Sequence, residues 1–280
     1  MIVDAHHHFW DPARADYPWL TEGLAPIRRA FGPADLAPSL AATDVDATIL
    51  VQTRSSEDET EEFLATAAAT PFIRGVVGWV NLRDPGVEDA IARLRAAPGG
   101  DRLVGIRHQV HDEADPEWLL RDDVRRGIAA VGRAGLVYDL LVRTRELPTA
   151  RAVVAEMPDV RFVVDHLAKP PIRDGALHPW AGEVDRFGSL PNASWKLSGL
   201  VTEADWATWQ PADLRPCVEH VLATVGPERL MFGSDWPVCL LAAPYEKVFS
   251  TARALLEGAG LSDRERAAVM GDNAVAVYGL

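Results

Sequence analysis

The sequence predicts an α/β fold, a single (β/α)8 barrel of the TIM type, and three observations support this. Eight short apolar runs alternate with helix-like runs along 280 residues, a length that such barrels commonly use as one domain. The apolar runs are nearly continuous, as expected for parallel strands buried on both faces. Polar residues collect at the C-terminal ends of these runs, where barrels of this type carry their active sites.

The expected elements alternate in a regular order. The strands are residues 2–8, 47–53, 73–81, 103–108, 136–142, 160–166, 193–198 and 229–235. The helices are residues 34–42, 57–69, 87–97, 117–134, 147–157, 180–186, 245–257 and 262–270, with a last turn at 273–278. An open, doubly wound sheet is the alternative, but it usually has a glycine-rich phosphate turn after its first strand, where this chain has His7-His8-Phe9-Trp10. No repeat or Gly/Ser-rich linker interrupts the chain, so one domain is expected over residues 1–280.

A long loop is expected at about residues 9–43, after the first strand. It contains Tyr17-Pro18-Trp19-Leu20 and closes with the short helix of residues 34–42. Loops of this length in compact domains are usually functional, often as a lid or a pocket wall. A packed aromatic plug explains the same residues equally well.

The composition limits the classes of function. The formal net charge of −13 and the absence of a basic cluster argue against nucleic acid as a partner. They do not bear on a small anionic substrate, because pocket charge and net charge are separate quantities. The two cysteines, Cys217 and Cys239, make no disulfide framework and fit a reducing compartment. With no signal peptide pattern and no apolar run long enough for a membrane, we expect a cytoplasmic monomer or homodimer.

The first strand, Ile2-Val3-Asp4-Ala5-His6-His7-His8, carries the strongest functional signal. Side chains alternate between the faces of a strand, so Asp4, His6 and His8 are expected on one side, and Val3, Ala5 and His7 on the other. His6 and His8 would then lie about 6.6 Å apart along the strand, close enough to share one ion or one substrate. An expression tag is the alternative, but a tag rarely lies within an apolar run that begins at the initiator Met.

Polar side chains also end most of the other expected strands. In a parallel barrel these ends meet at one rim, and burying charge there is costly unless the groups pair or bind a ligand. The rim residues are His6, His8, Gln52, Asn81, Arg107, His108, Asp165, His166, Ser198, Ser234 and Asp235. So many polar groups at corresponding positions predict an active site.

Three rim residues are the expected catalytic groups. Asp235 suits a general base for water or a metal ligand, although an Asp before a Pro-containing turn is also a common cap. His166 shares its segment with Lys169, which favours a functional role over that of a core histidine. Arg107 offers a planar, permanently charged fork for a carboxylate or a polarised carbonyl oxygen, and a salt bridge beneath the rim is the alternative.

Further residues are expected to bind substrate or to pack. The expected substrate-binding residues are Gln52, Trp79, His108, Tyr138, Lys169 and Trp236. Trp10, Trp19, Trp79 and Trp236 lie at strand ends or in the first loop and could form a ring-stacking wall, whereas Trp206 and Trp209 are expected to pack helices. His111, His178 and His220 are expected in solvated or structural positions.

At these residues the sequence resembles the amidohydrolase superfamily, which carries His-x-His on its first strand and Asp on its eighth. The resemblance is closer to the family-2 branch, which includes sugar-lactone and dicarboxylate-lactone hydrolases, and within it to the L-fuconolactonase and L-rhamnonolactonase type. The resembling stretches span nearly the whole chain. They are Asp4 to Pro12, Tyr17 to Leu20, Gly105 to His108, Asp165 to Pro170 and Phe232 to Pro237.

The resemblance leaves the metal question open. Two-metal members of the superfamily need a bridging Lys or Glu on the fourth strand and a His on the fifth, where this chain has Arg107-His108 and Tyr138-Asp139-Leu140, so a binuclear centre is not expected. The candidate ligands for one divalent ion such as Zn²⁺ are His6, His8, His166 and Asp235. The resembling lactonases equally suggest catalysis without a metal, in which Arg107 and the histidines polarise the carbonyl.

The resemblance implies hydrolysis of a sugar-acid lactone, such as L-fucono- or L-rhamnonolactone, to the hydroxy acid. Asp235 would take a proton from the attacking water, and Arg107 and His166 would stabilise the oxyanion. A metal-dependent decarboxylase of the same superfamily is the alternative, and a non-catalytic sugar-binding protein is a weaker one. The sequence leaves open which group assists the departure of the ring oxygen.

Overall fold

The computed structural model describes residues 1–280 and shows eight parallel strands in the order of the sequence. The strands are β1 (Val3–His7), β2 (Ala47–Val51), β3 (Ile73–Gly78), β4 (Leu103–His108), β5 (Val137–Leu140), β6 (Phe162–Val164), β7 (Ala193–Leu197) and β8 (Leu230–Phe232). The two ends of the sheet meet through a parallel bridge between His7 and Trp236 and through a 2.8 Å hydrogen bond from the Asp235 amide to the His6 carbonyl. The predicted (β/α)8 barrel is confirmed.

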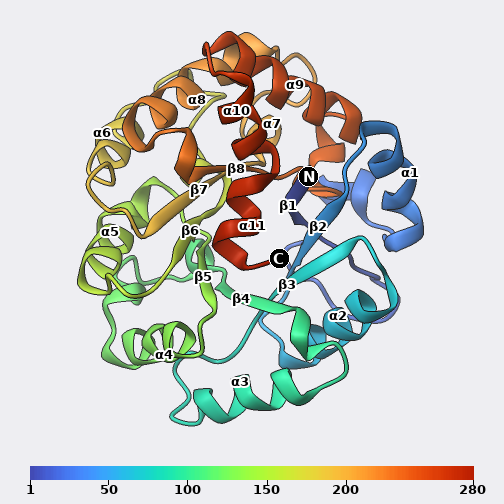
Figure 1. Cartoon of the computed structure of the whole chain (residues 1–280), viewed down its shortest axis with the longest axis vertical. Coiled ribbons are helices and arrows are strands. Elements are labelled where there is room, and N and C mark those ends of the chain that lie inside the picture. Colours follow the sequence, from blue (N-terminus) through green and yellow to red (C-terminus); the bar gives the residue numbers. More distant parts are fainter.

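Helices surround the barrel on all sides (Figure 1). They are α1 (Pro33–Thr43), α2 (Glu57–Ala69), α3 (Val87–Ala96), α4 (Asp122–Arg133), α5 (Leu147–Glu156), α6 (Trp180–Asp185), α7 (Leu200–Glu203), α8 (Pro211–Val225), α9 (Tyr245–Gly258), α10 (Asp263–Ala267) and α11 (Asn273–Tyr278). Helix α2 has its expected bounds, because the Ser56 side chain caps it by accepting a hydrogen bond from the Glu59 amide. None of the helices combines the length and apolar character of a membrane span.

The helix predictions fail in three places. The sequence pattern predicts no helix between the seventh and eighth strands, yet α8 is 15 residues long and contains Pro211 and Pro216. Pro211 lies at the start of the helix, where its missing N–H costs nothing, so only Pro216 removes a helical hydrogen bond. The expected helix 117–134 begins as a separate 3₁₀ turn at Trp118–Leu120, and the expected helix 262–270 becomes π-helical at Ala268–Asp272.

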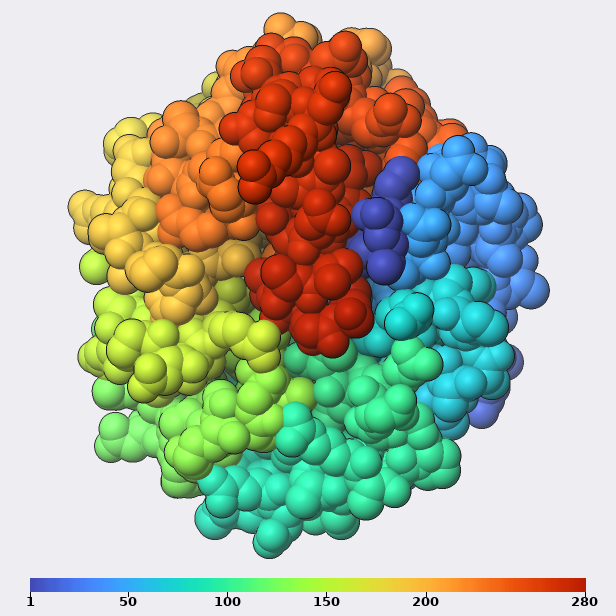
Figure 2. Space-filling model, in the orientation of Figure 1, coloured from blue at the N-terminus to red at the C-terminus, as the bar shows by residue number.

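The N-terminal end of the barrel is closed by α11. The C-terminal segment crosses the centre of this face in Figures 1 and 2. Ala274 and Tyr278 of α11 pack with the apolar side chains that fill the barrel interior, which include Val3, Ala5 and Val163. The opposite end, where the strands carry their polar residues, is therefore the end available for a site.

A register shift in β1 overturns one expectation about its faces. His6 and His8 do lie on one face, but Asp4 does not share it: its carboxylate accepts a hydrogen bond from Tyr245 of α9 at 3.1 Å. Ala5 instead belongs to the barrel interior, next to His6. The pairing with β2 shifts between Asp4 and His7, and such a bulge lets successive residues face the same side.

The loop after β1 packs its aromatic side chains together and also lines the central cavity. Trp10 forms an antiparallel bridge with Phe31, and its ring packs edge-on against Trp19 at 5.0 Å between ring centres. Phe31 in turn packs against Trp236 at 5.2 Å. Trp19 and Leu24 also face the central cavity, so both interpretations of this loop apply.

Candidate active site

Four side chains converge at the C-terminal end of the barrel. Oδ1 of Asp235 lies 3.9 Å from Nε2 of His6, 3.4 Å from Nε2 of His8 and 3.8 Å from Nε2 of His166. The Nε2 atoms of His6 and His8 are 3.1 Å apart. All four residues are buried, although they come from β1, the turn after β6 and the end of β8. The structure thus brings together the four residues that the sequence pattern indicates as metal ligands.

Three of these residues, His6, His8 and Asp235, fit a single zinc ion. Nδ1 of His8 lies 2.7 Å from the Val51 carbonyl oxygen, which can only accept, so Nδ1 carries the proton and Nε2 offers a lone pair. Nδ1 of His166 is paired with the Ser198 hydroxyl at 2.8 Å, a partner that can either donate or accept. Ligand atoms at about 2.0–2.1 Å from a tetrahedral zinc lie roughly 3.3–3.5 Å from one another, and the separations of 3.1–3.9 Å among His6, His8 and Asp235 bracket that range. His166 lies 3.8 Å from Asp235 Oδ1 but does not belong to this close group.

The protonation states also suit a metal. Burial lowers the pKa of both His6 and His166 well below the ordinary value, which keeps these imidazoles neutral as ligands must be. Burial alone would raise the pKa of Asp235, but the neighbouring His166 and His8 outweigh it, and the pKa lies below the ordinary value. Asp235 is therefore an ionised carboxylate beside the neutral imidazoles of His6 and His166 at neutral pH.

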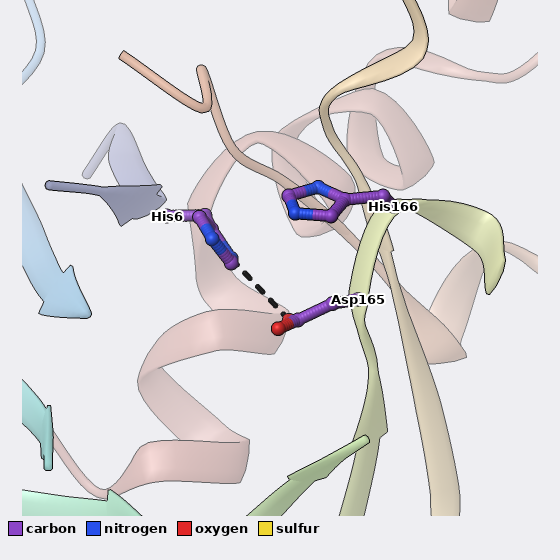
Figure 3. Close-up of side chains that lie close together, drawn as sticks. All are labelled: His6, Asp165 and His166. Carbon is purple, nitrogen blue, oxygen red and sulfur yellow. Dashed lines mark ion pairs between the residues drawn. The ribbon is translucent and has the colours of Figure 1, made fainter. Parts of the chain in front are cut away.

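A second carboxylate, Asp165, orients His6 from below (Figure 3). Its Oδ1 lies 3.3 Å from Nδ1 of His6, and its Oδ2 accepts a 2.9 Å hydrogen bond from Nη1 of Arg107. Burial opposes ionisation of Asp165, but the charge of Lys196, the hydrogen bond with His6 and the charge of Arg107 prevail and hold its pKa well below the ordinary value. Figure 3 shows His6 and His166 on either side of this carboxylate, which completes a second group of possible metal ligands.

Arg107 is a bound element of the site rather than a free cation. Its Nη2 donates to the backbone oxygen of Gln52 at 2.5 Å and to the side-chain oxygen of Gln52 at 3.0 Å, while Nη1 is paired with Asp165. The salt bridge that the sequence offered as the alternative is present, and Arg107 still lines the cavity. Gln52 holds Arg107 and is not among the cavity-lining residues.

Two buried charged residues near the site, Lys196 and Asp139, are not predicted from the polar residues at the strand ends. Nζ of Lys196 in β7 lies 2.5 Å from Asp139 Oδ2, 3.0 Å from Asp165 Oδ1 and 3.2 Å from His6 Nδ1. The Tyr278 hydroxyl of α11 donates to Asp139 at 2.9 Å, and burial raises the pKa of Asp139 to about 6. The sequence does offer one indication of these two residues. Asp139 and Lys196 are charged side chains inside otherwise apolar strands, and they lie on the strand face that points into the barrel.

A cavity of about 360 Å³ opens above these groups. Its floor is His8, Arg107, His166 and Asp235; its apolar wall includes Trp19, Leu24, Leu141, Val238 and Leu241; its polar wall includes His111, Asp112, Arg143, Lys169, Glu203 and Trp206. The sequence pattern predicts Lys169 at this cavity. It does not predict His111 and Trp206, because their positions depend on the path of loops rather than on strand order.

Four other expected substrate-binding residues lie away from the cavity lining. Trp79 donates its indole N–H to Nδ1 of His108 at 3.0 Å, and Nε2 of His108 bonds Glu113 at 2.8 Å. Both residues are thereby engaged in a cluster beside the cavity. Trp236 packs against the aromatic rings of the first loop.

Tyr138 is turned away from the cavity. It is fully buried, and its ring packs edge-on against Phe162 at 6.2 Å between ring centres. Side chains alternate along β5, so Tyr138 faces the helices because Asp139 faces the barrel interior. Tyr138 therefore does not line the cavity.

The turn that carries His166 has an unusual backbone. His166, Leu167, Ala168 and Lys169 have successive φ angles of 53°, 50°, 58° and 51°, in the left-handed region that non-glycine residues rarely adopt. Each such residue costs about 1–3 kcal/mol unless its surroundings enforce it. Here Leu167 and Ala168 are fully buried, and Trp180 donates its indole N–H to the Leu167 carbonyl at 2.7 Å. This turn ends β6 at Val164, before the last residues expected in the strand.

A family model described as amidohydrolase matches residues 3–280. The chain belongs to the amidohydrolase family. An L-fucono-1,5-lactonase from Burkholderia multivorans is 41% identical over 290 residues, which cover 100% of this chain and 96% of that protein. The crystal structure of a Burkholderia multivorans amidohydrolase with bound zinc has a TM-score of 0.95 at 39% identity and covers 100% of this chain and 99% of that one.

A more distant member of the same fold bears on the alternative function. A 2,6-dihydroxybenzoate decarboxylase from Rhizobium has a TM-score of 0.68 and covers 99% of this chain and 98% of its own. Its identity to this chain is 13%, so this likeness extends to the fold alone.

Proposed function

We propose that this amidohydrolase hydrolyses a sugar-acid lactone, L-fucono-1,5-lactone or a related aldonolactone, to the hydroxy acid. The observation that carries the proposal is the ring of His6, His8 and His166 around one oxygen of Asp235, at the floor of a cavity of about 360 Å³. The 41% identity to an L-fucono-1,5-lactonase over the full chain supports this substrate class.

The mechanism starts from Asp235. Its carboxylate is ionised and faces the cavity, so it can take a proton from a water molecule as that water attacks the lactone carbonyl. The resulting tetrahedral species breaks its ring C–O bond. The same carboxyl group can then return the proton to the departing ring oxygen, so the elements of water end in the carboxyl and hydroxyl groups of a single hydroxy acid.

One divalent ion, held by His6, His8, His166 and Asp235, would supply Lewis acidity for the carbonyl and lower the pKa of water. Asp165 and the backbone carbonyl of Val51 fix the planes of the His6 and His8 rings, which keeps their Nε2 atoms directed at Asp235. The metal-free alternative depends on Arg107 as the oxyanion donor. Both of its terminal nitrogens are already engaged by Asp165, His6 and Gln52, and its one unpartnered donor, Nε, is buried, which favours the metal-assisted route.

A panel of sugar lactones, assayed by acid release with and without a chelator, tests the proposal. We expect hydrolysis of L-fucono-1,5-lactone by wild-type protein loaded with zinc, and loss of activity after chelation. Activity that survives complete metal removal would support the metal-free route. Hydrolysis of no lactone in the panel would overturn the proposed function, and release of CO₂ from an aromatic acid would favour the decarboxylase.

A further inference from the structure

Lys169 is a cation of the cavity wall that keeps free hydrogen-bond donors. The charged side chains of Arg107, Arg143 and Lys169 all line it. Both terminal nitrogens of Arg107 are bonded to protein, and Arg143 is exposed at the mouth. The Lys169 side chain is 14% exposed, and its ammonium has a single protein partner, Glu203 Oε1 at 2.8 Å. Because an ammonium has three donors, two remain for a ligand in the cavity.

The backbone aims Lys169 at the same space as His166. The two residues lie at either end of the left-handed turn, and both line the cavity, whereas Leu167 and Ala168 between them are fully buried. Strained backbone of this kind persists only where the surrounding structure enforces it, and it is concentrated at functional sites. Its effect here is to place an ammonium beside an imidazole of the catalytic floor.

Glu203 fixes the position of this ammonium. It ends α7, the short helix after β7, and its carboxylate is 20% exposed. The Arg173 amide donates to the Glu203 carbonyl at 3.0 Å, which ties α7 to the chain that follows the strained turn. The positive charge of Lys169 also contributes to the lowered pKa of Asp235, so the two groups share one electrostatic environment.

Lactone hydrolysis develops negative charge at a second position besides the carbonyl oxygen, the ring oxygen that departs. When the tetrahedral species collapses, the bond between the carbonyl carbon and the ring oxygen breaks, and its electron pair passes to the ring oxygen. The proton that Asp235 took from water then completes the new hydroxyl group. An aliphatic alkoxide is a poor leaving group, so a fixed donor at this oxygen lowers the barrier.

We propose that Lys169 is a catalytic residue that stabilises the departing ring oxygen by hydrogen bonding, and that Glu203 positions it. This inference rests on the proposed lactone hydrolysis and adds a role within it. The ammonium donates a hydrogen bond and keeps its proton, so no net proton transfer from Lys169 is required.

The test compares wild-type protein with Lys169→Met and Lys169→Arg, on the sugar lactone that wild-type protein hydrolyses best. We expect Lys169→Met to lower kcat by about 100-fold or more, as loss of an oxyanion donor does, with KM changed by less than about 3-fold. Lys169→Arg should restore part of kcat, because it retains the charge. Glu203→Gln should lower kcat by about 10-fold, because Lys169 remains but is less firmly held.

An isotope effect separates this role from simple substrate binding. If Lys169 assists C–O cleavage, the kinetic isotope effect of ¹⁸O in the lactone ring should increase in Lys169→Met. Arg133→Met provides a matched control, since Arg133 pairs with Glu88 on the surface and its loss changes the net charge equally. That variant should retain wild-type kcat and isotope effect.

The possible results have distinct meanings. An increase of KM alone, or a lower kcat with an unchanged ring-oxygen isotope effect, would overturn the role of Lys169 while leaving lactone hydrolysis intact. Wild-type protein without activity on any lactone would overturn the proposed function itself. If Lys169→Met does not fold, as judged by its unfolding midpoint, the isotope effect of Glu203→Gln decides: an increase supports the inference, and a wild-type value contradicts it.

Discussion

Oδ1 of Asp235 lies 3.4 Å from Nε2 of His8, and this contact joins the segments that follow the last and the first strand of the barrel. The backbone secures it, because the Asp235 amide donates to the His6 carbonyl and the His8 amide donates to the Trp236 carbonyl at 2.7 Å. The Asp235 carboxylate is thus fixed to the first strand by the hydrogen bonds that close the sheet. The hydrogen bonds that close the barrel therefore also place Asp235 beside His6 and His8.

Replacement of Asp235 by Asn should abolish turnover without unfolding the protein. The amide cannot accept a proton from water, and loss of a general base typically costs about 10²–10⁴-fold in rate. We expect kcat on the preferred lactone to fall by that amount, with an unfolding midpoint near that of wild type. Near-normal lactonase activity in Asp235→Asn would show that another group is the base.

Gly199 should not tolerate even a methyl group. Its φ is +65°, and a Cβ atom there would lie 2.6 Å from Nδ1 of His166 and 3.1 Å from Oδ2 of Asp235. Gly199→Ala should therefore displace His166 and lower kcat by at least about 10-fold, in addition to a backbone cost of about 1–2 kcal/mol.

Gly135→Ala is the control for this substitution. Gly135 has a similar φ of +70°, but a Cβ atom would meet nothing within 4 Å. It should lose similar stability in a denaturant titration and keep full activity. Equal activity losses in the two variants would show that backbone strain, rather than the contact with His166, is responsible.

Zinc should stabilise the fold as well as the reaction. Its candidate ligands lie in or just after strands β1, β6 and β8, which are far apart in the sequence, so an ion bound to all of them binds the folded state only. At 100 times its dissociation constant it would add about 2.7 kcal/mol to the free energy of unfolding. Thermal unfolding of chelated protein, before and after zinc addition, measures this. The variant His8→Ala should show a much smaller shift, and an equal shift would place the ion elsewhere.

Asp4 should make the stability of the protein depend on pH. Its carboxylate accepts hydrogen bonds from the Ser234 amide at 2.8 Å and from the Tyr245 hydroxyl at 3.1 Å, but burial still raises its pKa to about 6. The unfolded value is about 3.9, so the folded state binds more protons between about pH 4 and pH 6. The contribution of Asp4 to stability is therefore present below this window and is lost as the pH rises through it.

The variant Asp4→Asn isolates this contribution, because an amide does not titrate. We expect the free energy of unfolding of Asp4→Asn, relative to wild type, to rise by about 2 kcal/mol between pH 4 and pH 7.5. Denaturant titrations at several pH values measure it. A difference that stays constant with pH would mean that the carboxyl group titrates at the same pH in the folded and unfolded states.

The sequence alone is enough to predict the barrel and the centre of the site. Strand and helix periodicity are local properties, and a parallel barrel places every strand end at one rim, so the pattern by itself groups His6, His8, His166 and Asp235. The sequence pattern does not predict helix α8, because its two prolines indicate a loop. Proline is tolerated at the first turn of a helix, however, and where a helix starts is not known from the sequence pattern alone.

Tertiary structure decides what each neighbouring residue does. The bulge in β1 turns Asp4 away from His6, and strand alternation turns Tyr138 toward the helices. The burial of Lys196 beside Asp139, and the meeting of Lys169 with Glu203 at the cavity wall, each depend on residues from different strands or loops. Periodicity specifies which segments form strands, but the direction of a side chain depends on register, bulges and loop paths. These are set only when the whole barrel closes and buries its core.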